Sequence, residues 1–108
     1  MRVTGAIVVI GLLVLAAHAA LAEEQRVSQK DKRFSKTALS VKTGDLITFV
    51  NDDQAMHNVY SYTEGFSFDL GGQSPGEETT VRLSKVGVLD IRCAIHPKMK
   101  LQVRVQPR

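Results

Sequence analysis

The residues of this chain that are best suited to hold a metal lie near its C-terminus. Cys93, His96 and Met99 follow one another at three-residue intervals, and Pro97 lies between the last two. A short loop can turn three such side chains toward one point, whereas a strand sends alternate side chains to opposite faces. Beyond the first 22 residues the chain has one other histidine, His57. The residue types and their spacing therefore predict a metal site in which His57 is the upstream ligand.

This donor set is typical of one metal. A thiolate, two imidazoles and a weak thioether are the ligands of blue-copper electron-transfer sites, in which the thioether is the long axial ligand. A structural zinc site normally has four strong ligands, so zinc is the weaker alternative. The expected ligands of one copper ion are His57, Cys93, His96 and Met99. Met56 is a second candidate thioether, but neighbouring strand residues face opposite ways, so we expect it in the core.

The first 22 residues have the pattern of a secretory signal peptide. Arg2 precedes an apolar run over residues 3–17, and Ala20-Leu21-Ala22 fits a small-x-small cleavage site. We expect cleavage after Ala22, which leaves one domain over residues 23–108 and places it in the periplasm through the general secretory route. The alternative is an uncut membrane anchor, because the segment approaches the roughly 20 residues that span a bilayer.

Cys93 is the only cysteine of the chain, which excludes a disulfide within it. Oxidising compartments pair or damage free thiols, so a lone cysteine in an exported protein is either buried and inert or a metal ligand. The histidine and methionine that follow it favour the ligand. A domain of this size also has a small core, which a bound metal would help to stabilise.

The elements that must position these residues have the pattern of β-strands. Residues 38–42 alternate apolar and polar side chains, a Thr-Gly-Asp turn follows, and residues 46–50 are rich in β-branched and aromatic side chains. Further strands are expected at residues 58–62, 78–83, 88–92 and 101–105. No stretch beyond the signal peptide has a helical period of sufficient length. The sequence therefore predicts a single all-β domain, an antiparallel sandwich.

Two segments resemble the cupredoxins, the blue copper protein family. Residues 55–59 and the closing Cys-x2-His-x2-Met of residues 93–99 look like its two ligand segments, and residues 39–51 are similar to the run before its first histidine. The closing loop is as short as that of the amicyanins. The resemblance implies a Greek-key β-sandwich whose copper cycles between Cu(I) and Cu(II). It also implies that the Asn58 side chain ties the upstream loop to the cysteine loop and fixes ligand geometry.

The charge of the chain and the resemblance together indicate the partner. A formal net charge of +3 is too small for nucleic acid as the main partner. The resemblance implies a redox protein such as a c-type cytochrome or a dehydrogenase, which docks at an apolar patch comprising Ala94, Ile95 and Pro97. The basic residues near this patch are Arg92, Lys98, Lys100 and Arg104. We therefore expect an acidic docking surface on the partner, and a monomer without membrane insertion after cleavage.

The expected function is that of an exported one-electron carrier and not of an enzyme. The alternative is a periplasmic copper-binding or copper-tolerance protein that stores or transfers copper, but the chain is poor in the exposed Met and His residues that such proteins use. No nucleophile and base with a third orienting group is recognisable. Asp52 and Asp53 lie where a strand ends in a turn, where solvated carboxylates are expected.

Overall fold

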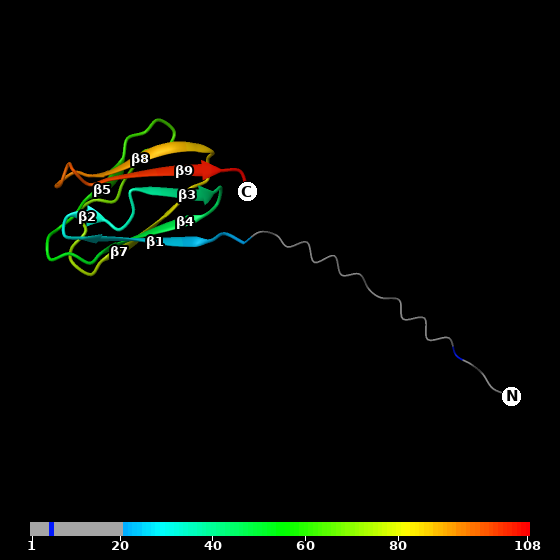
Figure 1. The fold of residues 1–108 in the computed structure, drawn as a ribbon, viewed down its shortest axis with the longest axis horizontal. Helices are drawn as coiled ribbons and strands as arrows, with labels where there is room; N and C mark the ends of the chain where they lie inside the picture. The colour runs from blue at the N-terminus through cyan, green and yellow to red at the C-terminus, as the bar shows by residue number, and fades with distance from the viewer. Residues whose placement is uncertain (1–4, 6–20) are drawn as a thin grey trace.

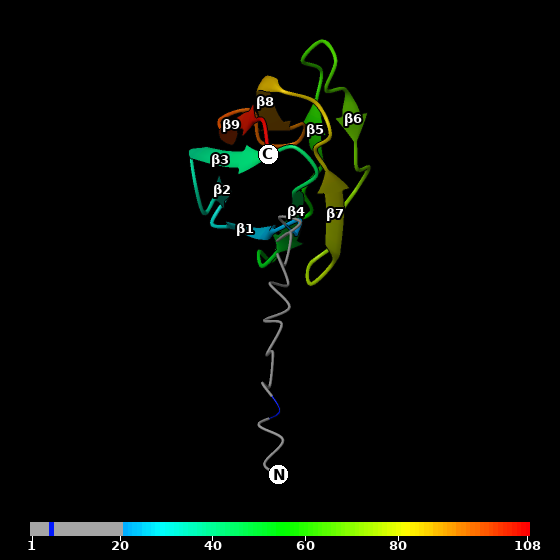
Figure 2. The same ribbon diagram turned by 90° about the vertical axis from the view of Figure 1, so that its right-hand side faces the viewer.

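The described part of the chain contains nine β-strands, eight of which are labelled in Figure 1, and β6 is labelled in Figure 2. The computed structural model describes residues 5 and 21–108, so the predicted signal peptide lies almost wholly outside the described residues. The strands are β1 (Glu24–Lys30), β2 (Arg33–Phe34), β3 (Ala38–Lys42), β4 (Leu46–Asn51), β5 (Val59–Ser61), β6 (Phe68–Asp69), β7 (Glu78–Arg82), β8 (Gly87–Cys93) and β9 (Lys100–Gln106). Within these described residues, no helix of the length and apolarity needed to cross a membrane is present.

The strands form two sheets that face each other across one core (Figure 2). One sheet has the order β2-β1-β4-β7 and the other the order β3-β9-β8-β5-β6. The all-β sandwich is thus confirmed, but the expectation of purely antiparallel pairing is wrong, because β1 pairs parallel with β4 and β3 pairs parallel with β9. Parallel neighbours need a long connection. Here other strands lie between each pair in the sequence and supply it.

The six predicted strands are all present, with ends that move by at most one residue. Three further strands, β1, β2 and β6, were missed. In β1 the sequence EQRVSQK has one apolar residue, Val27, and its other inward-facing residue is the buried Gln29. A strand without apolar alternation gives no period-two signal. The strands β2 and β6 have two residues each, which is too short for any pattern.

Core packing fixes the position of Cys93, the last residue of β8. Leu89, Ile91 and Cys93 alternate inward along this strand and are at most 1% exposed, whereas Val88 faces outward. Val59 of β5 is paired with Cys93, and Asn51 at the end of β4 is paired with Gln29 of β1. The segment between β4 and β5, the loop between β8 and β9 and the turn between β1 and β2 therefore meet at one end of the sandwich.

Candidate metal centre

His57 is held by its backbone on both sides. Its N–H donates to the carbonyl of Gln73 at 3.1 Å, and its carbonyl accepts from the N–H of Gln73 at 2.7 Å. The side-chain amide of the buried Asn51 donates to the carbonyls of Ala55 and Gln73, at 2.9 and 2.8 Å. These bonds close the segment that follows β4, so the His57 ring is fully buried and fixed in direction.

The loop after β8 is equally constrained. The N–H of Ala94 donates to the carbonyl of Asn58 at 2.9 Å, and the N–H of Met99 donates to the carbonyl of His96 at 3.0 Å. The first bond ties the loop to the segment that carries His57. The second closes the loop into a turn, so His96 returns toward Cys93 before β9 begins.

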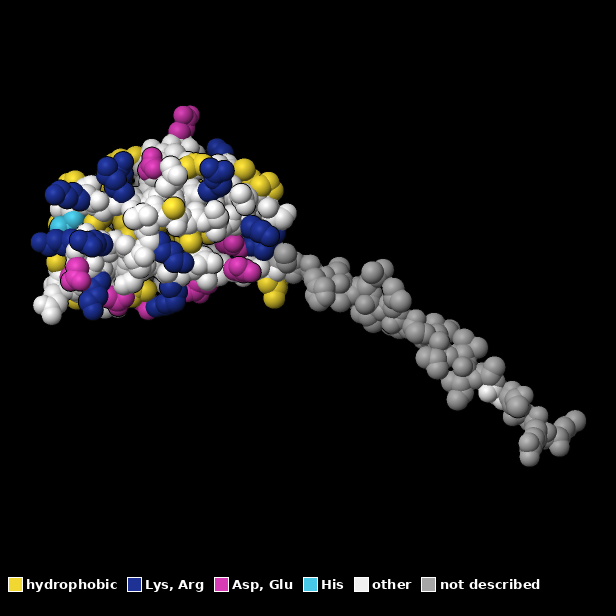
Figure 3. Space-filling view, in the orientation of Figure 1, with side chains coloured by type: hydrophobic (Ala, Val, Ile, Leu, Met, Phe, Trp, Pro, Cys, Tyr) yellow, Lys and Arg dark blue, Asp and Glu magenta, His cyan; other side chains and the backbone are white. Residues whose placement is uncertain are grey.

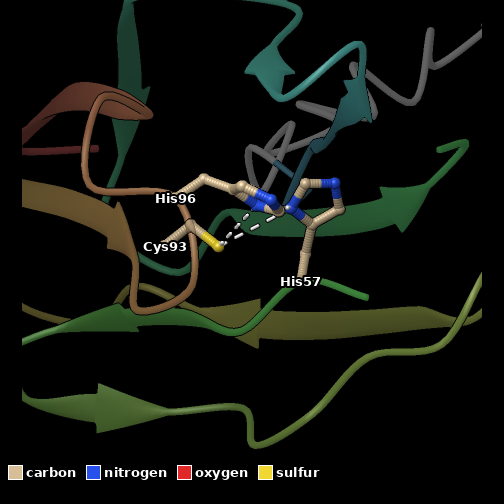
Figure 4. A group of neighbouring side chains, drawn as sticks. All are labelled: His57, Cys93 and His96. Carbon is tan, nitrogen blue, oxygen red and sulfur yellow. Dashed lines mark hydrogen bonds between the residues drawn. The ribbon is translucent and has the colours of Figure 1, made fainter. Parts of the chain in front are cut away.

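Three donor atoms converge at this point, as Figure 4 shows. Nδ1 of His57 lies 3.6 Å from Sγ of Cys93, Nδ1 of His96 lies 3.8 Å from that sulfur, and the two nitrogens are 3.1 Å apart. A point equidistant from the three atoms is about 2 Å from each, close to the distance of about 2.0–2.1 Å at which imidazole nitrogen binds a divalent ion such as zinc. The three residues that the sequence analysis placed in one site are thus brought together with room for one ion.

The chemistry of the donors narrows the choice of metal. Two nitrogens and one sulfur in a triangle are the trigonal set of a blue-copper site, and the fourth expected donor is a thioether. Met99 is 2% exposed and lies at the end of the same loop. The residues present therefore fit one copper ion.

Asp53 is the residue that the sequence analysis misjudged. It was expected to be solvated, but its side chain is only 14% exposed and Oδ2 lies 2.9 Å from Nε2 of His57. The backbone N–H of Lys32 donates to the same oxygen at 2.9 Å. That bond, followed by the contact with His57, lowers the pKa of Asp53 from 3.8 to about 2. The spacing of four residues between an aspartate and a histidine was the one signal for this contact in the sequence.

An ionised carboxylate accepts hydrogen bonds and cannot donate them. Nε2 of His57 must therefore carry the proton in this contact, which leaves the lone pair on Nδ1, the atom that faces Cys93. The pKa of His96 also lies below its ordinary value, mainly because the ring is partly buried and further because His57 and Lys32 are near. The lowered pKa of His96 favours its neutral imidazole, the form that binds metals.

Two other sequence expectations are changed by the structure. Asn58 does connect the two segments, but through its backbone: its N–H donates to Sγ of Cys93 at 3.3 Å, while its side chain donates to Asp69 at 2.7 Å. Met56 is 51% exposed, so its expected place in the core is wrong. Neighbouring residues do face opposite ways, but His57 takes the inward position and Met56 the outward one.

Comparison with known proteins agrees with this geometry. The model of the family described as copper binding proteins, plastocyanin/azurin family, matches residues 22–106. The methylamine utilization protein MauL of Methylorubrum extorquens is 32% identical over 87 residues, which cover 80% of this chain and 76% of that protein. The protein of the same name from Methylophilus methylotrophus is 30% identical over 89 residues, which cover 78% of this chain and 50% of its own length.

Solved structures share the fold. The Cu(I) form of an amicyanin variant has a TM-score of 0.71 at 21% identity and covers 75% of this chain and 80% of its own. A purple cupredoxin from Nitrosopumilus maritimus has a TM-score of 0.67 at 22% identity, over 75% of this chain and 98% of its own. The cupredoxin fold that the resemblance implied is therefore confirmed. With a family model that spans the whole sandwich and a cluster that fits one copper ion, the chain belongs to the plastocyanin/azurin family of copper-binding proteins.

Proposed function

We propose that this protein is an exported carrier of single electrons. The observation that carries the proposal is the convergence of two imidazole nitrogens and one thiol sulfur at a single buried point. The proposed ligands are His57, Cys93, His96 and Met99. Bound there, copper supplies a Cu(I)/Cu(II) couple.

The surroundings of the proposed ligands suit repeated electron transfer. Cys93 is at the end of a core strand, and His57 is fixed by two backbone bonds to Gln73. Ligands that are locked by packing and hydrogen bonds keep their positions when the charge at the centre changes. The N–H of Asn58 on the sulfur helps to hold the thiolate in place. Little atomic motion between the two oxidation states means a low barrier to electron transfer.

Burial favours electron transfer over copper delivery. His57, Cys93 and Met99 are at most 2% exposed, and His96 is the partly exposed member of the proposed set. A protein that hands copper to a partner must let the partner's ligands reach the ion. An electron needs only a short route, which the His96 ring would provide at the surface beside Ile95 and Pro97.

The relatives suggest where such a carrier would act. Two of them are named for methylamine utilisation, which supports a place for this carrier in a methylamine-oxidising system. The proposed partner there is a redox protein such as a dehydrogenase or a c-type cytochrome. The exposed Ile95 and Pro97 would form the apolar part of the docking surface, and Lys98 in the same loop would favour an acidic partner. We propose that the carrier acts as a monomer and has no catalytic reaction of its own.

Replacement of the thiol tests the proposed ligand set. In Cys93→Ser the copper centre loses its thiolate, so we expect the intense thiolate-to-copper visible absorption to disappear. The control is Met56→Leu, which changes an exposed sulfur beside His57 and should keep the absorption. Both are measured by visible spectroscopy after copper loading. Full visible absorption in Cys93→Ser would rule out the proposed centre.

The axial position is tested by Met99→Leu. A weak axial donor tunes the reduction potential of a blue-copper site, so its removal should raise the potential while most of the visible absorption remains. Voltammetry of the wild type, Met99→Leu and Met56→Leu measures the change. An unchanged potential in Met99→Leu would show that Met99 is not the axial ligand.

We also propose that cleavage after Ala22 releases residues 23–108 into the periplasm. All nine strands lie beyond this point, and the N–H of Glu23 already donates to the buried Asp45 at 2.9 Å. A cut here would leave every strand intact. Intact-mass measurement of the protein from a periplasmic extract should give a chain that begins at Glu23. A full-length chain found in the membrane fraction would instead support the uncut anchor.

A further inference from the structure

A groove of about 620 Å³ lies beside His96. One wall is the turn between β1 and β2, and the other is the loop between β8 and β9. Asp31 and Lys32 form the tip of the turn with φ angles of 52° and 57°, which suits a two-residue hairpin turn. The sequence analysis did not associate this turn with the site.

The rim of the groove is strongly basic. Four cations belong to its walls and all are exposed: Lys32, Arg33, Lys98 and Lys100. Asp31 is the one acidic residue among the lining. Across residues 21–108, none of the four cations forms an ion pair. Figure 3 shows Lys and Arg side chains on both sides of the histidine at this end of the molecule. Unneutralised cations around a hollow attract anions.

The predicted basic rim is therefore only partly correct. Lys98 and Lys100 line the groove, but Arg92 and Arg104 do not. Arg104 is paired with Val88 and lies four residues beyond Lys100 along β9. Its place in the charged wall is taken by Lys32 and Arg33. These two were missed because more than sixty residues separate them from the ligand loop in the sequence.

The interior of the groove is apolar. Phe34 and Met99 are buried beneath it, and Ile95, which is 48% exposed, borders it with Pro97. An occupant must then offer negative charge to the rim and an apolar side chain to the interior. An acidic loop of a protein has both. Such an occupant would also contact His96, which lines the groove on the side of the β8–β9 loop.

We propose that this groove docks an acidic loop of the redox partner, with an apolar side chain of that loop between the two basic walls. The proposal rests on the proposed electron-carrier function and names the surface by which it operates. Docking here places the partner against the partly exposed His96. The two walls hold the loop from both sides, so the β1–β2 turn contributes to the choice of partner.

A binding experiment separates this proposal from electron transfer itself. The probe is a synthetic peptide of alternating Glu and Leu, titrated into Cu(I)-loaded protein and followed by amide NMR shifts. We expect shifts at residues 31–34 and 95–100 that weaken as salt is added, because surface charge interactions are screened. The NMR shifts report peptide binding and do not require electron transfer. A protein that fails to cycle between Cu(I) and Cu(II) would therefore still show them if the groove binds the peptide.

Charge reversal on both walls provides the decisive comparison. Arg33→Glu/Lys100→Glu should weaken peptide binding at least tenfold. The control Lys42→Glu/Arg82→Glu makes the same charge change at the opposite end of the sandwich, where Lys42 pairs with Gln106 and Arg82 with Leu46, and should keep the affinity. If peptide binding weakens equally in both variants, the groove is not the docking site and the proposal is wrong. Equal binding of a Gln/Leu peptide, or full displacement by inorganic phosphate, would also overturn it in favour of an apolar or a small-anion site.

A second inference is carried independently by the contact between Asp53 and His57. The carboxylate is fixed from two directions besides the histidine: the N–H of Lys32 donates to Oδ2, and the N–H of Gln54 donates to Oδ1 at 3.0 Å. Asp53 also donates its own N–H to the side chain of Asn51 at 2.9 Å. A carboxylate held this firmly against a fully buried ring sets the direction of that ring.

The geometry points to Asp53 as a positioning residue that orients His57 and increases the basicity of its metal-binding nitrogen. A carboxylate on the outer N–H of a metal-binding histidine fixes its tautomer and makes the other nitrogen a stronger donor. A stronger nitrogen donor and a nearby negative charge both stabilise Cu(II) more than Cu(I). The inference rests on His57 being a ligand.

Asp53→Asn tests this role, with Asp52→Asn as the matched control. Asp52 is the exposed neighbour, so its replacement removes the same charge without touching His57. We expect Asp53→Asn to bind Cu(II) about 10–100-fold more weakly, the usual effect of losing such a partner. The reduction potential should rise by about 59 mV for each tenfold by which Cu(II) binding weakens more than Cu(I) binding.

The outcome separates positioning from a purely structural role. If Asp53→Asn lowers only the free energy of unfolding of the metal-free protein and leaves the Cu(II) affinity and the potential at wild-type values, the inference is wrong. If Asp52→Asn shifts the potential as much as Asp53→Asn, the effect is one of general charge, and the positioning role is likewise overturned.

Discussion

The approach of two imidazole nitrogens and a thiol sulfur to within 3.8 Å of one another is the constraint on which the rest of the structure depends. Without a metal, two neutral imidazoles and a thiol gain little from such crowding. Buried polar groups normally need hydrogen-bond partners, and desolvating them without one is costly. The surrounding fold must therefore hold the three groups together, and a shared ion gives all of them a partner at once.

The fold meets this constraint with backbone hydrogen bonds. β8 delivers Cys93 at the edge of the core, and the carbonyl and N–H of Asn58 join the strand end to the segment that holds His57. Asn51 and Gln73 close that segment from the other side. Apart from the side-chain amide of Asn51 and the thiol of Cys93, the groups in these contacts belong to the main chain, so most of the contacts depend little on side-chain identity. The same fold can therefore be kept while most of the sequence changes, as the 21% identity to an amicyanin variant with a TM-score of 0.71 illustrates.

The sequence predicted the parts of this molecule that local patterns encode. Cys93, His96 and Met99 fall in one loop, so their spacing carries the information, and His57 followed by elimination. Asp53 could not be found in this way, because its burial depends on the backbone of Lys32 in a turn that is distant in sequence. The strand β1 was missed for a related reason: its buried Gln29 bonds to Gln73, a contact that no local pattern records.

The same turn links the interior of the site to its surface. Asp53 accepts from the backbone of Lys32 and contacts His57, while the Lys32 side chain belongs to the basic wall beside His96. The charge that would attract a partner and the carboxylate that orients a proposed ligand are thus fixed by one element.

The central claim is that this cluster holds one redox-active copper ion through a thiolate. The most direct measurement is a combined visible and paramagnetic-resonance spectrum of residues 23–108 loaded with one equivalent of Cu(II), followed by voltammetry of the same sample. The account predicts an intense thiolate-to-copper band and fast, reversible one-electron cycling. A colourless product without that band, or slow cycling with ready transfer of Cu(I) to a chelator, would contradict it.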